Sequence, residues 1–548
     1  MKKLFNLKTE KRTALTIMIY VFAFIFARYL CYGCIYFYQL DDYIQYWAYP
    51  TRPDRWGVVL EQGLLSSRPL AGLLDIYFWG NFFYSMVFVV LIISVLYALS
   101  SVLFLRVFKK YFKTGFMFVF FYALMPFFYE SVYWVSASSR IVVGLFFTSA
   151  AVFFLQRFFE TKKKRYIPLF FITQLVSLCF YEQIFVLSTT LSFIVIVLNL
   201  KENRKYISFL AILIFNAILY FGFTFAFKNT GSAIGSRMSI IIPSFSEWYI
   251  NIVFSLLNQI KTAFFDAPLA ITFKGFLRGI KLIITDGLWF LIPVIIIFVC
   301  GAFVLGMKEE NYNIKNTDRK KTFFVGVIIA VVPVSIFFVI ANPYISMRNI
   351  LPSFVGIALI LDMIFSYMAY KKKIFMQIVA SALAALFFVS AISETHDYKA
   401  VYDFDMKVGK NIEKVMKDNE YSYKTAFIIQ NDDKGSVNIK FHEHGAGVTS
   451  SDWALWGLLN YFDYDNKQNN KKAIPVQTDN NIYHYPWDKE AKDLSSFDKI
   501  YYWNNAESEF IEVLLNEITD DYAEILAVDG WKVAAIKEYN NTGYIFYN

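Results

Sequence analysis

Cysteine is scarce in this sequence, with four residues among 548, namely Cys31, Cys34, Cys179 and Cys300. All four lie within or beside apolar segments, so no disulfide framework is expected. Cys31 and Cys34 have CxxC spacing, but no histidine or further cysteine lies near them to complete a metal site. The sequence therefore predicts no cysteine-based metal centre, and these cysteines indicate no cofactor.

Charged residues are also few, at 18% of the chain, whereas hydrophobic residues make up 57% and aromatic residues 20%. The mean hydropathy of +0.43 exceeds that of an ordinary soluble domain of this length. The formal net charge of +9 is divided among short basic clusters between apolar segments, and it forms no continuous basic face. We therefore predict a polytopic α-helical membrane protein whose partner is the lipid bilayer and not a nucleic acid.

About eleven membrane-spanning helices are predicted, because a helix needs about 20 apolar residues to cross a bilayer. The candidate segments lie near 14–38, 82–105, 115–134, 141–158, 166–181, 183–200, 207–227, 287–306, 323–341, 350–370 and 374–392. The polar triplet Tyr181-Glu182-Gln183 interrupts the stretch 166–200, which is expected to form two short spans. The basic start is followed by a long apolar run without a cleavage site, so the first helix is expected to be retained.

The lysine and arginine clusters predict the orientation. With the N-terminus inside, the basic clusters between spans all fall on the cytoplasmic side. An odd number of spans places the tail outside. The prediction is thus a transmembrane domain over 1–392, with catalytic outer loops 39–81 and 228–286, and a soluble extracytoplasmic α/β domain over 393–548. The expected location is the bacterial cytoplasmic membrane.

The polar tail has mixed periodicity. Helices are predicted over 397–418, 452–462 and 507–517, and strands over 425–430, 499–503 and 531–538.

Asp41 and Asp42 form the first candidate site. They are adjacent carboxylates just after the first span, where charge is costly unless water, a cation or a substrate compensates it. A divalent cation at this pair is one alternative, and a solvated end of the first helix is another. The third interpretation is that one of the two aspartates is a catalytic base. The pair is the leading candidate for a functional site on the predicted outer side.

Four arginines on the predicted outer side are candidates for binding a phosphate: Arg68, Arg140, Arg237 and Arg348. Arg68 precedes Pro69, which restrains the arginine backbone toward an extended form. Arg348 lies in a short loop that keeps its guanidinium near headgroup depth. The alternative for Arg68 is a surface cation that snorkels to the interface, and the alternative for Arg348 is ordinary binding of lipid headgroups.

Glu182, with Tyr181 and Gln183, lies where the two short spans meet. A glutamate there can bind an acceptor hydroxyl or a cation, or pair with Arg68 or Arg348 across a cavity. The alternative is a polar break that stabilises two short helices.

These motifs together resemble integral-membrane GT-C glycosyltransferases, especially bacterial type II glucosyltransferase-like proteins that modify surface polysaccharides. The resemblance covers roughly 14–392 and depends on Asp41-Asp42, Ser67-Arg68-Pro69-Leu70, Tyr181-Glu182-Gln183 and Met347-Arg348-Asn349. It implies an inverting hexosyltransferase with an aspartate base. Its partners would be a polyprenyl-phosphate sugar donor, such as one on undecaprenyl phosphate, and a cell-envelope glycan acceptor.

Two other functions use the same residue types. A transporter or flippase for lipid-linked sugars also needs phosphate-binding cations but no base. A polysaccharide polymerase or ligase would instead take a glycan linked to a lipid diphosphate.

Overall fold

The computed structural model contains two compact units. It describes residues 2–228, 241, 243–244, 246–307, 316–340, 343–368, 373–418, 425–430, 447–450, 452–462, 471–479, 482–484, 498–504, 507–518, 522–527, 532–536 and 545–546. The helical unit consists of Met1–Ile35 and Asp54–Thr395, and the sheet unit consists of Tyr36–Pro53 and His396–Asn548. The predicted outer loop 39–81 is thus divided between the two units, and the predicted boundary at 392/393 falls inside one continuous helix.

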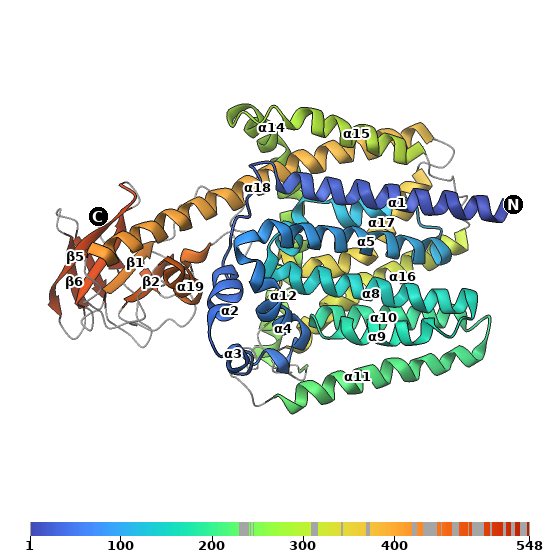
Figure 1. The fold of residues 1–548 in the computed structure, drawn as a ribbon, viewed down its shortest axis with the longest axis horizontal. Helices are drawn as coiled ribbons and strands as arrows, with labels where there is room; N and C mark the ends of the chain where they lie inside the picture. The colour runs from blue at the N-terminus through green and yellow to red at the C-terminus, as the bar shows by residue number, and fades with distance from the viewer. Residues whose placement is uncertain are drawn as a thin grey trace. The chain divides into compact units, whose positions relative to one another are not determined.

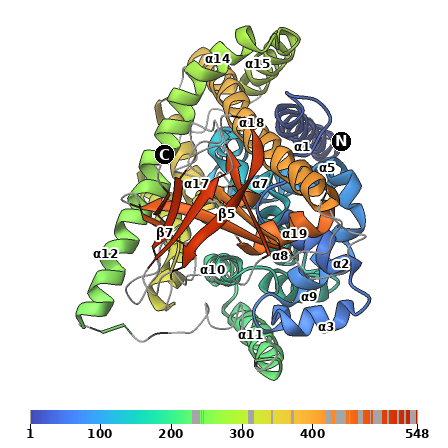
Figure 2. The same ribbon diagram turned by 90° about the vertical axis from the view of Figure 1, so that its left-hand side faces the viewer.

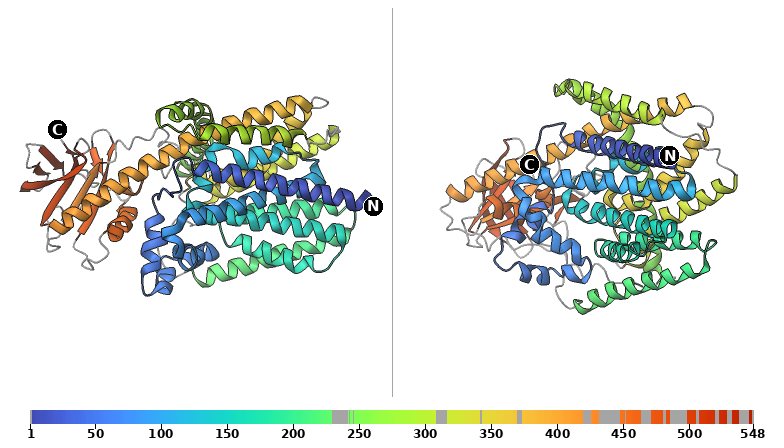
Figure 3. Two further views of the ribbon diagram at one scale, coloured as in Figure 1. Left: turned by 45° about the horizontal axis from the view of Figure 1, so that its top comes forward. Right: turned by 45° about the vertical axis from the view of Figure 1, so that its right-hand side comes forward.

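Among the described residues of the helical unit, eight helical stretches are long and apolar enough to cross a membrane, which confirms a polytopic helical membrane protein. They are Arg12–Tyr29, Trp79–Phe112, Val135–Thr161, Glu182–Asn199, Arg204–Ala226, Asp318–Val339, Met347–Met368 and Ile374–Asp418, the last of which continues beyond this unit. Two shorter apolar helices are Tyr166–Leu178 and Leu291–Gly306. Figures 1 and 3 show these helices side by side in a bundle.

The bounds of the bundle helices are α1 (Lys2–Tyr29), η3 (Trp79–Ser85), α5 (Met86–Phe112), α8 (Val135–Thr161), α9 (Tyr166–Leu178), α10 (Glu182–Asn199), η6 (Arg204–Ser208), α11 (Phe209–Ala226), α15 (Leu291–Met307), α16 (Asn316–Ser335), η9 (Ile336–Val339), η10 (Met347–Ile350), α17 (Leu351–Met368) and α18 (Lys373–Asp418).

The segment predicted as a regular span near 115–134 is a chain of short helical pieces, so that prediction is wrong. The pieces are α6 (Met117–Val119), η4 (Phe120–Leu124), η5 (Pro126–Phe128) and α7 (Tyr129–Val132). Asp362 accepts hydrogen bonds from the backbone N–H groups of Gly115 and Phe118, and Arg28 donates to the carbonyls of Leu124 and Met125. These side chains satisfy the backbone groups that the breaks expose, and the segment is buried in protein, where irregular backbone is tolerated.

The predicted interruption between two short spans is confirmed. Helix α9 ends at Leu178 and α10 begins at Glu182, with Tyr181 between them in an extended conformation (φ −157°, ψ 144°). The first span is shorter than expected, because α1 ends at Tyr29 and Gly33 turns the chain with φ 105°. These two ends fix where the polar loops leave the bundle.

The part of the predicted first loop that belongs to the helical unit folds as four short helices. They are α3 (Arg55–Glu61), η2 (Leu64–Ser66), α4 (Pro69–Tyr77) and η3. Asp54 caps α3 by accepting from the Gly57 N–H at 2.7 Å. Pro69 begins α4, where its missing N–H has no cost. The Leu70 N–H donates to the Cys179 carbonyl at 3.3 Å, which ties α4 to the α9–α10 junction.

A long helical run crosses the end of the bundle in Figure 2. It comprises α12 (Glu247–Lys261), η7 (Thr262–Asp266), α13 (Ala267–Leu269), η8 (Ala270–Lys274) and α14 (Gly275–Thr285). Residues at every fourth position, from Ala263 to Gly279, are buried or face α18. The wider π-helical turns of η7 and η8 keep this four-residue repeat on one face. The second predicted outer loop is therefore helical over 247–285.

The sheet unit combines an eight-stranded sheet with the end of α18 and a short helix, α19 (Asp452–Phe462). The strand order is β3-β2-β1-β4-β5-β6-β7-β8, with β1 parallel to β2 and β4 and the other pairs antiparallel. The strands are β1 (Thr425–Gln430), β2 (Lys471–Asp479), β3 (Ile482–His484), β4 (Lys499–Asn504), β5 (Glu509–Ile518), β6 (Tyr522–Ala527), β7 (Lys532–Ile536) and β8 (Ile545–Phe546). The helix predicted over 507–517 is wrong, because this stretch pairs with β4 as β5.

The chain segment 36–53 completes the sheet unit with η1 (Ile44–Ala48) and α2 (Tyr49–Thr51). Its aromatic rings pack against the end of α18 and against α19. The Tyr38 and Tyr402 ring centroids are 6.2 Å apart, and those of Tyr43 and Tyr461 are 5.4 Å apart. A Cβ at Gly457 would overlap Ile44, so α19 approaches η1 closely. Helix η13 (Val448–Ser450) is held by Asp405, which accepts from the Val448 N–H at 2.7 Å.

Candidate functional site

Arg68 and Glu182 form an ion pair between the start of α4 and the start of α10. Arg68 Nε donates to Glu182 Oε1 at 2.8 Å, and Nη2 donates to Oε2 at 3.0 Å. Two parallel bonds fix the guanidinium plane, and the carboxylate also lies at a helix N-terminus, which favours negative charge. Within the described residues, this pairing leaves both N–H groups of Nη1 available to an additional anion. The predicted pairing of Glu182 with Arg68 is confirmed.

Tyr181 connects this ion pair to a third segment of the chain. The Arg68 guanidinium carbon lies 4.3 Å from the centroid of the Tyr181 ring, within the range of a cation–π contact. The Tyr181 hydroxyl donates to Asn349 Oδ1 at 2.8 Å, and Asn349 Nδ2 donates to the Tyr344 carbonyl at 3.0 Å. Both ends of the Asn349 amide are thus used, and the tyrosine is held over the guanidinium.

Arg348 lies next to Asn349 in η10 and is half-buried. Its guanidinium carbon is 5.4 Å from the ring centroid of Trp134, which is fully buried just before α8. The Ser131 hydroxyl donates to the Arg348 carbonyl at 3.1 Å. The aromatic ring and the serine hold Arg348 beside the α7–α8 junction. We call Arg68, Tyr181, Glu182, Arg348 and Asn349 the Arg68 cluster.

The two guanidinium groups of the Arg68 cluster affect each other. Burial acts to lower the pKa of Arg68, but the Glu182 carboxylate and Tyr181 act to raise it, and Arg348 acts to lower it again. The net result is an Arg68 pKa above its ordinary value, so this side chain stays protonated. Because Arg348 contributes repulsion at Arg68, an anion near both groups would be stabilised by both.

Buried polar atoms flank the cluster. Gln183, Ser67 and Ser346 are 1%, 7% and 5% exposed. The amide atoms of Gln183 and the two serine hydroxyls have no hydrogen-bond partner among the described residues. Such groups are costly to bury unless water or a ligand satisfies them. Of the predicted polar trio, Tyr181 and Glu182 therefore contact Arg68, and the adjacent Gln183 is buried with capacity for further hydrogen bonds.

Arg140 lies in a different arrangement. Its Nη2 donates to Asp75 Oδ2 at 3.0 Å, and the Ser139 hydroxyl donates to Asp75 Oδ1 at 3.0 Å. The side chains of Arg140 and Asp75 are 16% and 4% exposed. This pair ties α4 to α8, so the structure gives Arg140 a bridging position. Arg237, the fourth predicted arginine, lies outside the described residues.

Asp41 and Asp42 belong to the sheet unit and differ in their surroundings. Asp42 is fully buried, and its Oδ2 accepts from the Tyr36 hydroxyl and from the Gln39 N–H, both at 2.8 Å. Asp41 is half-buried, with Gln45 Nε2 donating to its Oδ2 at 3.4 Å. Asp42 therefore fixes the turn, whereas Asp41 keeps the greater contact with solvent.

The backbone beside Asp41 is strained. Leu40 has φ 30°, a left-handed conformation that costs a residue other than glycine about 1–3 kcal/mol. The surrounding contacts hold the turn in place, because Gln39 Nε2 donates to the Tyr398 carbonyl at 3.1 Å and Tyr43 packs on Tyr461. Strain held in this way occurs often at functional positions, which is consistent with a chemical role for the acid that follows.

A divalent cation at the aspartate pair was one of the predicted alternatives. The O–H donor of Tyr36 and the N–H donor of Gln39 both bind Oδ2 of Asp42. In the part of the chain that the structure describes, no three His, Cys, Asp or Glu residues are grouped to hold a metal ion.

Two residues of these arrangements were not identified from the sequence. Asp75 is the only acid in α4, and a lone carboxylate in an apolar helix is a usable signal for a buried ion pair. Trp134 has no such signal, because aromatic residues are common throughout this chain.

Comparison with protein-family models, with characterised proteins and with solved structures finds no match to this chain.

Proposed function

We propose that this protein is a membrane glycosyltransferase that moves a hexose from a polyprenyl-phosphate donor to a cell-envelope glycan. The observation that carries the proposal is the Arg68 cluster. It brings together residues from three separate segments, and these are three of the four segments on which the resemblance to GT-C glycosyltransferases depends. The site offers hydrogen-bond donors for a phosphate and a fixed aromatic ring. These features suit the binding of a lipid-linked sugar in a membrane protein.

In this proposal, Arg68 and Arg348 bind the phosphate of the donor. When the bond between the anomeric carbon and the phosphate oxygen breaks, its electron pair stays on the phosphate. The leaving group thus gains negative charge, and a fixed cation stabilises that charge more in the transition state than in the bound donor. The Nη1 group of Arg68 is the proposed phosphate donor, because Nε and Nη2 are occupied by Glu182.

Asp41 is the proposed base. It takes the proton of the acceptor hydroxyl as that oxygen forms the new bond to the anomeric carbon, with inversion at this carbon. Its greater exposure and the strained Leu40 beside it favour Asp41 over Asp42. Asp42 is proposed to hold the turn through Tyr36 and Gln39.

The proposal includes a GT-C-like fold in the bacterial cytoplasmic membrane, with the N-terminus inside and the sheet unit outside. The basic clusters between spans support this orientation. This orientation requires the broken segment 113–134 to cross the membrane as well, because a further crossing there keeps the alternation of sides.

The test uses the full-length protein in liposomes with synthetic polyprenyl-phosphate hexoses and an envelope glycan. Asp41→Asn is expected to lower transfer by about 10²–10⁴-fold, the usual contribution of a general base, without weakening donor binding. Asp403→Asn is the matched control, because Asp403 is an exposed acid of the sheet unit paired with Lys399 on the same helix. Transfer by Asp41→Asn at the wild-type rate would refute the proposed mechanism.

The same liposomes separate the enzyme from a transporter. Movement of the intact lipid-linked sugar across the bilayer, with no transfer to the glycan, would favour a flippase instead. Transfer only from a diphosphate-linked glycan would favour a polymerase or ligase.

A further inference from the structure

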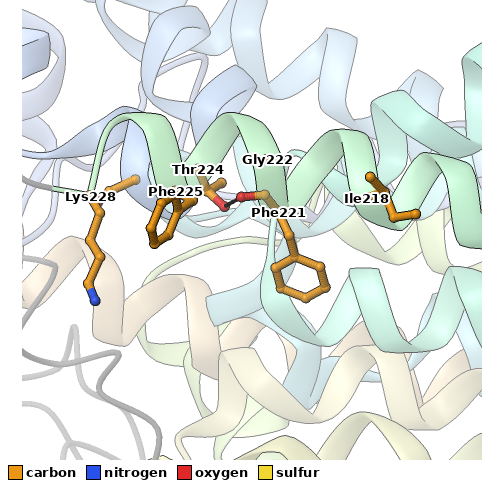
Figure 4. A pocket seen from close by; sticks show the side chains of 7 residues that line it. Ile218, Phe221, Gly222, Thr224, Phe225 and Lys228 are labelled. Carbon is orange, nitrogen blue, oxygen red and sulfur yellow. Dashed lines mark hydrogen bonds between the residues drawn. The ribbon is translucent and has the colours of Figure 1, made fainter.

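A groove of about 570 Å³ runs along α11 in the helical unit. It is lined by Ser66 and, on α11, by Ile218, Phe221, Gly222, Phe225 and by Lys228 just beyond the helix (Figure 4). The volume is within the range of small-ligand sites, about 300–1,000 Å³. Because α11 belongs to the candidate membrane span Arg204–Ala226, a ligand of this groove would lie beside the acyl chains of the bilayer.

The spacing of the lining residues places an apolar strip and a cation on one face. Ile218, Phe221 and Phe225 follow helical spacing and are 61%, 55% and 75% exposed. Figure 4 shows Phe221, Phe225 and Lys228 along the same side of α11, with Lys228 at the end. A molecule with a long apolar chain and an anionic head complements this pattern.

The cationic end of the groove adjoins the loop that carries Arg68. Helix α11 packs against η2, where Ser66 forms part of the groove wall two positions before Arg68. The Tyr220 hydroxyl donates to the Ser67 carbonyl at 2.7 Å. One face of α11 thus leads to the phosphate-binding residues of the Arg68 cluster.

Gly222 lines the groove without a side chain of its own. A Cβ built at Gly222 would meet no protein atom within 4 Å, so packing within the protein does not require a glycine here. A glycine inside a helix costs about 0.5–1 kcal/mol relative to alanine. Its absent side chain leaves space that faces the groove.

We propose that this groove binds the isoprenoid chain of the lipid phosphate whose head the Arg68 cluster binds. The proposal rests on the proposed function, because it assigns the apolar part of the same donor. Phe221 and Phe225 contact the chain, Gly222 leaves room for it, and Lys228 attracts the phosphate toward Arg68.

The first experiment fills the groove. Gly222→Phe is expected to raise the KM for a long-chain polyprenyl-phosphate hexose roughly tenfold, the effect of removing about two methylene groups from the groove. A donor with only two isoprene units should show a much smaller change. The control is Ile214→Phe, since Ile214 is 60% exposed on the same helix but lines no part of the groove. Equal KM values for Gly222→Phe and Ile214→Phe would overturn the proposal.

The second experiment needs no variant, and its labelling step does not depend on catalysis. A polyprenyl phosphate with a diazirine in its chain is photolysed with the wild-type protein in phosphatidylethanolamine–phosphatidylglycerol vesicles. Labelling of the α11 stretch around 218–225, reduced by unlabelled polyprenyl phosphate but not by added phosphatidylglycerol, supports the groove. Equal competition by phosphatidylglycerol, or labelling elsewhere only, overturns it. Labelling without any sugar transfer would refute the proposed function but keep the groove.

Discussion

Two arginine–carboxylate pairs of the helical unit use similar chemistry in different settings. Both start from α4, where Arg68 precedes the first residue and Asp75 lies near the end. Arg68 pairs with Glu182, and their side chains are 22% and 11% exposed, whereas Arg140 and Asp75 are 16% and 4% exposed. The first pair is therefore the more open one.

The surroundings of the two carboxylates explain what each pair can do. Asp75 also accepts from Ser139, so it is held by two groups of α8 and joins two helices. Glu182 holds two donors of Arg68 and leaves Nη1 available within the described residues. A saturated carboxylate suits a fixed link, and an arginine with spare donors suits a ligand. We therefore propose that the Arg68 pair binds a ligand and that the Arg140 pair stabilises the contact between α4 and α8.

The largest expected difference is in sugar transfer. Arg68→Ala should lower kcat/KM per folded molecule by about 10²–10³-fold, as expected when a fixed donor to a developing anion is lost. Arg140→Ala should change the same quantity less than about threefold, because its effect is on folding. The measurement is transfer in liposomes, normalised to the folded fraction from size-exclusion chromatography. Equal losses of kcat/KM in Arg68→Ala and Arg140→Ala would show that the two arginines do not differ in their role in sugar transfer.

A smaller difference is expected in stability. Asp75→Asn leaves the half-buried Arg140 without its carboxylate and should lower the free energy of unfolding by about 2–3 kcal/mol. Glu182→Gln should cost less, because water can reach the more exposed Arg68. Tryptophan-detected thermal unfolding in one detergent, compared with wild type, gives the order. A larger loss for Glu182→Gln would show that the Arg68 pair is the structural one.

The Arg68 pair could be predicted from sequence for an identifiable reason. A polar triplet inside an apolar stretch has few ways to be stabilised, and Arg68 was one of two expected partners for Glu182. The α9–α10 break followed from the same triplet. The role of Arg140 could not be separated from that of Arg68, because Asp75 was not recognised in the sequence as the partner of Arg140.

The broken segment 113–134 was missed for a different reason. Hydropathy registers only that these residues are apolar, whereas the breaks depend on groups distant in sequence. Asp362 binds two N–H groups near its start, and Arg28 binds two carbonyls in its middle. Strand β5 was mistaken for a helix because pairing with β4 overrides the helical spacing of 507–517.

The smallest expected effect is the dependence of the donor KM on pH, which follows from the charge of Arg68. Burial opposes the Arg68 cation, but Glu182 and Tyr181 outweigh it and raise the pKa of Arg68 above its ordinary value. A raised pKa contributes stability that is fully present below the unfolded-state pKa and is lost only as the pH rises through the folded-state pKa. Both values lie far above the working range.

Arg68 should therefore keep one charge state, and the donor KM should change less than about twofold between pH 7 and pH 9.5 in the wild type. The Arg68→His variant should differ from the wild type, because histidine titrates near pH 6.5 and loses its charge as the pH rises above this value. The KM of this variant should rise between pH 5.5 and pH 7.5, whereas Arg140→His should show no such rise per folded molecule. Initial rates at several donor concentrations and constant ionic strength test this. A flat profile for Arg68→His would show that the charge at position 68 does not bind the donor phosphate, and the two ion pairs would then share one structural role.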